Sequence, residues 1–589
     1  MKPIKSIQCK DHLFTILLVS CILFLLAVTF LHHRNPAKYD ILLSCETIPT
    51  PFFSVPEGLY DQPFELEITA PDGYTIYYTT DGSIPTINSR KFKTSITVDP
   101  QKNLNKKILS IPTTFLLKEP SWRRYQPIWK PPRGQQNHST VIRARCFKNG
   151  LGYGKVENVI YSTPNIIQHH GFQVIHILIE ADSLFSSKKG IYVLGDKYYN
   201  KQSRIYVENQ FENIWGWAHY PANYSQSNKD WIRPAEFILI DSAGKSIFEQ
   251  TVKIRMDGFS SRYFPLKAIR IIADGNRGDT VLHYPFFDYL SYETFKHIKL
   301  RNSSSDMPLT MFRDAMVQQT VRGVRDTKLD IQGYAPAVVY INGNYWGIHN
   351  IREKMDENYL AVKYDAPMEM IDLLILRETG FIYSNGDTLS LSSFYELIEF
   401  IKKNSFDNNE EAYQHVCSQM DIDNFIDYVI VETYYTNLDW ITNNIKTYRI
   451  NRQTEIMKEQ SIEAGKWRWL LYDLDACLWS PELNMVERFK EDRFIHSDFS
   501  LIFNNLLENK LFREKFKSRY EYIITHYLTT EYVIQCIEYF EDLYQLEMER
   551  HIARWRYPGS IQIWRTNVEE MKDFIRKRPE IVLDQLKEL

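Results

Sequence analysis

The sequence has few cysteines and no excess of either charge. Its 589 residues include seven Cys, and none forms a CxxC pair, so neither a structural zinc site nor a thioredoxin-like centre is supported. The formal net charge of -3 provides no overall basic field for binding nucleic acid, and we expect no nucleic-acid partner. One disulfide would suit an external compartment, but the spacing does not say which cysteines would form it.

The composition is that of a globular protein with more than one domain. Hydrophobic residues make up 44% and charged residues 24% of the chain, which are ordinary values for packed domains. The length allows two or three domains. Aromatic residues reach 14%, which suits both strand-rich cores and surfaces that stack on sugars or bases.

One long apolar run lies near the N-terminus. Residues 13–31, "LFTILLVSCILFLLAVTFL", carry no charge, and a helix rising about 1.5 Å per residue would nearly span a bilayer core of about 30 Å. Lys2, Lys5 and Lys10 precede the run, so the positive-inside rule places residues 1–12 in the cytoplasm. The alternative is a cleaved signal peptide. We expect a retained single-pass anchor, with the main body outside the cytoplasm, followed by a linker over residues 32–49.

Residues 50–165 have the pattern of a small antiparallel β-sandwich. "FELEITA", "YTIYYTT", "STVIRARCF" and "ENVIYS" read as strands, and "PDG" and "TTDGSIPT" as turns. The stretch "IYYTTDGSIPT" resembles the chitobiase/β-hexosaminidase C-terminal-like domain. That resemblance implies an accessory role as a spacer or binding module. A glycan contact through Tyr77, Tyr78 and Asp81 is one reading, and a simple packed turn is the one we favour.

A basic insertion interrupts this sandwich at about residues 102–134. It places Trp122, Tyr125 and Trp129 among lysines and arginines. Aromatic rings beside cations suit anionic polymers or lipid head groups. The insertion is therefore a candidate contact for a glycan or an anionic envelope polymer, with a solvated loop as the plainer reading.

The remaining chain, residues 172–585, is strand-rich at first and helix-rich later. Segments such as "VIHILIE", "AEFILID" and "HIKLRN" precede helical patterns from residue 392 onward. This order predicts an α+β body of two lobes with a ligand-binding cleft between them.

Three polar motifs in this body suggest phosphate and metal chemistry. Gly258, Ser260 and Ser261 lie in a turn between two strands, where a flexible backbone can approach a phosphate. Lys267 opens the next strand and offers a fixed cation to phosphates. A Gly-Ser turn before a strand is common, so this motif is weak by itself.

Asp439 and Asn444 have the spacing D-x-x-x-x-N of a kinase catalytic loop, in which the Asp accepts a proton and the Asn binds metal. An Asx turn or helix cap would explain either residue singly. Asp473 and Asp475 end the strand "WRWLLYD" and would point to one side if the strand continued. Carboxylates of this kind suit Mg²⁺ or Mn²⁺, and the alternative is a solvated strand end.

The order of these motifs resembles that of the CotH kinase family, the spore coat protein H-like atypical protein kinases. The matching segments are "GFSSRYFPLK" (258–267), "YINGNYWGIHNIREKMD" (340–356), "NLDWITNN" (437–444), "WRWLLYDLD" (467–475) and the helical C-terminus. The resemblance covers roughly residues 172–585. Phe259 and Leu266 depart from it, standing where the family has Asn and Lys.

The resemblance implies transfer of a phosphoryl group from ATP to protein Ser or Thr hydroxyls, with Mg²⁺ or Mn²⁺. It implies that Asp439 acts as the base and that Asn444, Asp473 and Asp475 bind metal. Lys267 would contact the phosphates, with Asp314 as a candidate partner of that lysine. The cofactor-binding set would be Gly258, Ser260, Ser261, Arg262, Lys267 and, on the adenine side, Glu353.

Two other functions remain open at this point. A kinase-like body without catalysis could present a surface to a glycan or protein partner, and Phe259 and the accessory sandwich favour it. A glycosidase would need an acid and nucleophile pair about 5 to 10 Å apart, and no pair in the sequence has that support. The retained acid, amide and acid set favours the kinase.

Overall fold

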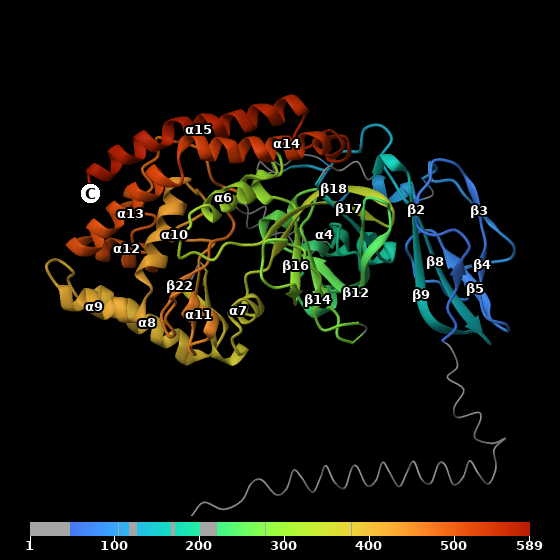
Figure 1. Ribbon diagram of the computed structural model, residues 1–589, viewed down its shortest axis with the longest axis horizontal. Helices are drawn as coiled ribbons and strands as arrows, with labels where there is room; N and C mark the ends of the chain where they lie inside the picture. Colours follow the sequence, from blue (N-terminus) through green and yellow to red (C-terminus); the bar gives the residue numbers. More distant parts are fainter. Residues whose placement is uncertain are drawn as a thin grey trace, which may run out of the picture.

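The structure is a computed structural model that describes residues 48–103, 105–116, 127–166, 171–200, 221–276, 278–377 and 380–589. Figure 1 shows a β-sandwich, a β-barrel and a helix-rich part following one another from one end of the molecule to the other. The expected anchor at residues 13–31 lies outside the described residues. Among the helices that are described, none combines the length and the apolar character needed to cross a membrane.

The sandwich forms where the alternating segments predict strands. A five-stranded sheet has the order β2-β9-β8-β5-β6, and β1 pairs with β4 and β3 with β7. The sheet is not wholly antiparallel as expected, because the edge strand β2 runs parallel to β9. Apolar side chains such as Leu66, Ile142 and Tyr161 give the sandwich its own core. Its strands are β1 (Phe52–Phe53), β2 (Gly58–Leu59), β3 (Phe64–Leu66), β4 (Ile68–Thr69), β5 (Thr75–Thr79), β6 (Arg90–Lys91), β7 (Ile96–Val98), β8 (Thr140–Lys148) and β9 (Leu151–Ser162).

The described arms of the basic insertion pack on the barrel and on the C-terminal helices. The Thr113 hydroxyl donates to the Pro265 carbonyl at 2.7 Å, and the Arg133 amide donates to the Ala553 carbonyl at 2.8 Å. Trp129 is buried in the main core, so its ring is not part of an exposed surface for anionic polymers. Trp122 and Tyr125 lie outside the described residues.

Seven strands close into a barrel in the order β10-β11-β12-β13-β16-β18-β17. Alternation explains the packing: Val252, Ile254 and Met256 of β12 are buried, whereas Lys253 and Arg255 between them are only partly covered. The strands are β10 (Gln173–Leu178), β11 (Arg233–Ile240), β12 (Ser246–Met256), β13 (Ile269–Ala273), β16 (His297–Arg301), β17 (Tyr334–Ile341) and β18 (Asn344–Glu353), and β14 (Leu282–His283) pairs with β15 (Thr294–Phe295) beside them.

The helix-rich part surrounds a second, four-stranded sheet of order β20-β19-β21-β22. The two longest helices, α14 and α15, run side by side along one edge in Figure 1. The strands are β19 (Ile371–Arg377), β20 (Gly380–Asn385), β21 (Lys446–Ile450) and β22 (Arg468–Trp469). The α-helices among the described residues are α3 (Ala181–Phe185), α4 (Gly195–Tyr199), α6 (Arg313–Arg322), α7 (Glu357–Tyr364), α8 (Thr388–Lys403), α9 (Glu410–Gln419), α10 (Ile422–Tyr434), α11 (Glu455–Glu459), α12 (Asp498–Glu508), α13 (Lys510–His526), α14 (Thr530–Trp555) and α15 (Ile561–Lys587).

The expected two lobes share one core. A single cluster of buried apolar side chains runs from barrel residues such as Ile254 and Ile351 to helical residues such as Phe425 and Phe540. A smaller cluster around Leu360 fills the space between α7 and the second sheet. The barrel and the helix-rich part therefore stand in a fixed relationship, and the site lies where they meet.

Candidate functional site

The loop after α10 is positioned by that helix. Asp421 caps the helix by accepting from the Asn424 amide, and nearly every residue of α10 is buried. Just beyond it, Asn437 donates to the Glu432 carboxylate at 2.8 Å and accepts from the Asp439 amide at 3.2 Å. The buried helix therefore holds the loop that carries Asp439.

The structure brings Asp439 and Asn444 together. The Asn444 side-chain amide donates to the Asp439 carboxylate at 3.0 Å, and Asn443 donates to its other oxygen at the same distance. The Asp439 side chain reaches solvent, but partial burial and the nearby Asp473 raise its pKa to about 6. A carboxylate with a pKa near neutrality is well suited to accept a proton from a hydroxyl group.

Asp473 and Asp475 converge by a route that differs from the expected one. Strand β22 ends at Trp469, and Asp473 has φ +67°, so the two acids do not share one face of a continuing strand. Instead, the same guanidinium nitrogen of Arg301 contacts both carboxylates. Although burial opposes it, this pairing holds the pKa of Arg301 well above its usual range.

The oxygen donors here fit a hard divalent cation. One carboxylate oxygen of Asp475 is buried and has no hydrogen-bond partner among the described residues, and the same holds for one oxygen of Glu432. Burial raises the pKa of both carboxyls, and neighbouring acids raise it further. In the described part of the chain, no three His, Cys, Asp or Glu side chains gather as a metal site. Mg²⁺ commonly needs only one or two protein carboxylates, because waters and substrate phosphates complete its shell.

Glu432 was not anticipated from the sequence. It directly follows the apolar run Tyr428–Val431 of α10, and a carboxylate at a buried helical position was the signal available.

The turn at Gly258 is built as the sequence suggests. Gly258 has φ +90°, and a Cβ added there would lie 2.0 Å from the Ser261 hydroxyl oxygen. Ser260 and Ser261 begin the short helical turn Ser260–Tyr263, and Arg262 donates to the Ser225 carbonyl at 2.8 Å. A glycine is therefore required for this backbone path.

The two positions that depart from the family pattern differ in burial. Phe259 is exposed and Leu266 is buried.

Lys267 has a different place from the one expected. Its ammonium group donates to the carbonyls of Arg262 and Phe264 at 2.7 and 2.8 Å and lies 3.9 Å from the Tyr224 ring centroid. Complete burial lowers its pKa well below the usual value. Asp314, its expected partner, pairs instead with Arg352 at 3.0 Å. Lys267 thus holds the Gly258 turn together from inside.

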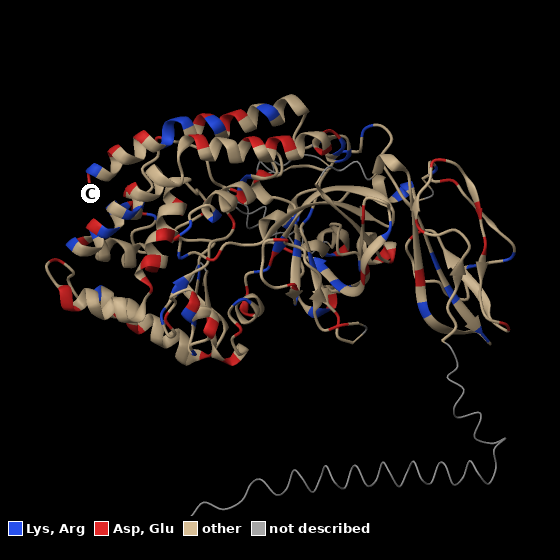
Figure 2. Cartoon of the chain, viewed as in Figure 1, with Lys and Arg blue, Asp and Glu red and all other residues tan. Residues whose placement is uncertain are grey.

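A row of cations crosses the barrel beside this turn. Each of four adjacent strands contributes one cation, and each cation is directly opposite the next. They are Arg255 on β12, Arg270 on β13, Lys299 on β16 and Arg352 on β18. Figure 2 shows basic and acidic positions close together on the barrel and on the loops beside it. Like charges directly opposite one another on a sheet are destabilising, so bound anions would stabilise this row.

Asp257 forms ion pairs with two cations of that row. It accepts from Arg270 at 2.8 Å and lies 3.2 Å from the Lys299 ammonium. These cations hold the pKa of Asp257 well below its usual value, although burial acts in the opposite direction. The Arg255 Nε is buried without a hydrogen-bond partner among the described residues. In the sequence, the alternation of "HIKLR" is the signal that Lys299 and Arg301 share one face of a strand. It does not show which strands lie beside that strand.

Glu353, the expected adenine-side acid, is engaged within the chain. Its carboxylate accepts from the Gly333 amide at 2.7 Å and from the Tyr292 hydroxyl, and burial raises its pKa. Both oxygens therefore have partners, and Glu353 fixes the end of β18.

Comparison with known proteins agrees with this arrangement. The family described as "CotH kinase protein" matches residues 254–582, more than half of the chain. The family described as "Chitobiase/beta-hexosaminidase C-terminal domain" matches residues 55–109, within the sandwich. No curated protein matches the chain.

Proposed function

The chain belongs to the CotH kinase protein family, and from that premise we propose that it is a metal-dependent protein kinase that transfers the γ-phosphate of ATP to Ser or Thr hydroxyls. We further propose that residues 13–31 anchor it in a membrane with the main body outside the cytoplasm. The observation that carries the kinase proposal is the cation row beside the Asp473 and Asp475 pair, since phosphoryl transfer depends mainly on positioning and charge stabilisation. Arg301, two residues after Lys299 on β16, contacts both of these acids.

The cation row supplies the phosphate contacts. Lys299 and Arg270 share Asp257, and Arg255 has an unused buried donor, so the row can bind phosphate oxygens without breaking its own pairing. The Gly258 turn closes one end of the row, because Asp257 immediately precedes it. Arginine forks and a lysine point charge are the usual ligands of phosphate groups.

The acidic residues supply the metal ligands. Asp473, Asp475 and the amide oxygen of Asn444 would hold Mg²⁺ or Mn²⁺, with Glu432 behind them. When bound, the ion supplies positive charge against the charge on the phosphates. Arg301 already lies between the two carboxylates and offsets the repulsion that would otherwise separate them.

Asp439 accepts the proton of the attacking hydroxyl. The oxygen of that hydroxyl forms a bond to the γ-phosphorus, the bond from phosphorus to the bridging oxygen breaks, and ADP leaves. Asn443 and Asn444 hold the two Asp439 oxygens in place, so the carboxylate keeps a fixed orientation through the step.

A phosphotransfer assay with labelled ATP tests the proposal. The purified protein is incubated with γ-labelled ATP and a generic acceptor protein, first with Mg²⁺ and then with Mn²⁺, beside the Asp473→Ala variant. Label on Ser or Thr of the acceptor or of the protein, lost in the variant, supports the proposal. Release of inorganic phosphate alone contradicts it.

A second candidate function is a kinase-like protein that binds a partner without catalysis. The specific observation in its favour is the Arg301 guanidinium, which lies where a cation would bridge Asp473 and Asp475. If no transfer occurs and no nucleotide raises the melting temperature, this candidate becomes the better account.

A further inference from the structure

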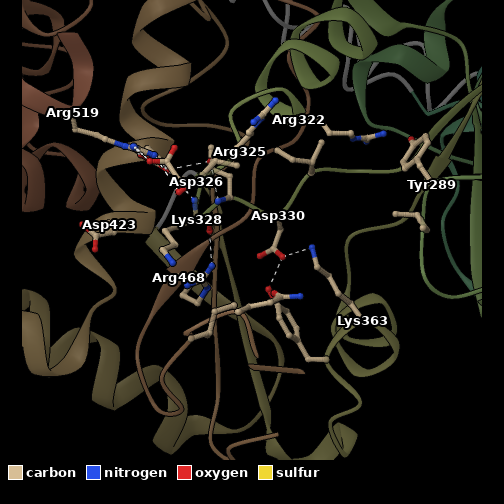
Figure 3. Close-up of a pocket in the computed structure, with 18 residues that line it drawn as sticks. Tyr289, Arg322, Arg325, Asp326, Lys328, Asp330, Lys363, Asp423, Arg468 and Arg519 are labelled. Carbon is tan, nitrogen blue, oxygen red and sulfur yellow. Dashed lines mark hydrogen bonds and ion pairs between the residues drawn. The ribbon is translucent and has the colours of Figure 1, made fainter. Parts of the chain in front are cut away.

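A cavity of about 690 Å³ lies at the junction of the barrel and the helix-rich part (Figure 3). It is lined by the end of α6, the loop that follows, and side chains of α7, α10 and α13. Asp439, Asp473 and Lys299 do not line it, so the cavity is separate from the proposed phosphotransfer site. Its size is that of a small-molecule site.

The acidic side chains of the cavity are already neutralised. Each forms a close ion pair with a basic side chain, and Arg519 serves two of them. The pairs are Asp326–Arg519 at 2.8 Å, Asp427–Arg519 at 2.8 Å, Asp330–Lys363 at 2.5 Å and Asp423–Lys515 at 2.6 Å.

Three cations of the lining are not neutralised in this way. Across the described ranges, no carboxylate lies within ion-pair distance of Arg322, Arg325 or Lys328. One terminal nitrogen of Arg322 is buried without a hydrogen-bond partner in those ranges. The Arg322 guanidinium is held in place 3.7 Å from the centroid of the Tyr289 ring. The other terminal nitrogen of Arg322 donates to the Gln332 carbonyl at 3.1 Å. A fixed guanidinium with one unused terminal nitrogen, together with the two other cations, can recognise a phosphate group.

The size and lining of the rest of the cavity suit a ligand larger than phosphate alone. Its volume greatly exceeds that of one phosphate ion, and Leu290, Leu329, Ile331 and Ile462 contribute apolar lining. We propose that the cavity binds an organic phosphate of about mononucleotide size, with its phosphate on Arg322, Arg325 and Lys328 and its apolar portion against these four side chains.

Binding of AMP and of inorganic phosphate to the full chain, measured by calorimetry, tests this site. AMP serves as a probe because it joins one phosphate to a planar ring. The triple variant Arg322→Gln/Arg325→Gln/Lys328→Gln removes the cations, and the double variant Arg325→Gln/Lys328→Gln leaves the partly covered Arg322 in place. A matched control, Lys188→Gln/Lys189→Gln/Lys197→Gln, removes three exposed charges elsewhere. Lys299→Ala disables the cation row.

We expect the parent, the control and Lys299→Ala to bind AMP with similar affinity and more tightly than inorganic phosphate. Both pocket variants should lose at least about tenfold in AMP affinity, since a charged hydrogen bond contributes more than the free energy of a tenfold change. The proposal is overturned if AMP does not bind, or if only Lys299→Ala weakens it. That second result would place AMP in the phosphotransfer site and would leave the kinase proposal standing.

Discussion

The guanidinium of Arg301 contacts the carboxylate of Asp475 in the interior, and the same nitrogen contacts Asp473. Arg301 lies on the barrel, and the two acids follow strand β22 of the second sheet. One side chain of the barrel thus pairs with both acids of the helix-rich part, at the place where we propose a metal ion.

Arg301→Ala should destabilise the protein and make its stability depend on divalent cations. Removing one partner of a buried ion pair typically costs about 3 to 5 kcal/mol. Because Mg²⁺ can take the place of the lost charge, it should stabilise the variant more than the parent. Urea unfolding in EDTA and in MgCl₂ at matched ionic strength measures this. The exposed Arg452→Ala is the control, and equal Mg²⁺ effects on parent and Arg301→Ala would contradict the account.

Lys299→Met should weaken ATP binding at least about tenfold, because it removes an inner cation of the row and keeps the length of the side chain. Lys253→Met is a matched control on β12, since Lys253 pairs with Asp274 at 2.6 Å and not with the row. Calorimetric titration with ATP and Mg²⁺ makes the comparison. Similar losses in both variants would mean that the row has no specific part in binding.

Gly258→Ala should lower the free energy of unfolding by about 1 to 3 kcal/mol, because φ is +90° and the new Cβ would meet the Ser261 hydroxyl. Adding Ser261→Ala removes that oxygen and should recover part of the loss. A double-mutant cycle by urea unfolding measures the coupling. Effects that add within about 0.5 kcal/mol would show that the two residues do not clash.

His176→Phe should make the protein less sensitive to acid. Both ring nitrogens of His176 are buried without partners in the described residues, and burial lowers its pKa to about 3. As pH falls below about 6.5, this histidine binds a proton in the unfolded chain but not in the folded protein. Stability is therefore lost until the pH reaches the pKa of the folded state. The advantage of the variant should grow by about 2 kcal/mol between about pH 7 and about pH 5. Urea unfolding at both pH values measures it, and a constant difference would refute it.

The sequence predicts the local parts of the site well. The turn with Gly258 lies between strands β12 and β13, and the spacing of Asp439 and Asn444 brings their side chains together. These features depend on short-range patterns of apolar residues and spacing, which a single sequence contains.

Most of what the sequence does not reveal depends on contacts between distant segments. Arg301 meets Asp473 across 172 residues, and the register that aligns Arg255, Arg270 and Lys299 involves three strands. Lys267 looked like the phosphate contact because its motif matches the family, yet neighbouring carbonyls and the Tyr224 ring take up its ammonium group. The orientation of such a side chain depends on the tertiary structure around it.

Asp439→Asn is the sharpest test of Asp439 as the proton acceptor in phosphoryl transfer. The substitution keeps the shape of the side chain and removes its capacity to accept a proton, while the cation row and the acid pair stay intact. With ATP and Mg²⁺, the parent should transfer the γ-phosphate to protein hydroxyls. The variant should bind ATP with similar affinity and lose transfer by at least about a hundredfold, the usual contribution of a general base. Transfer that persists in the variant, or a parent that binds ATP and transfers nothing, would contradict the account.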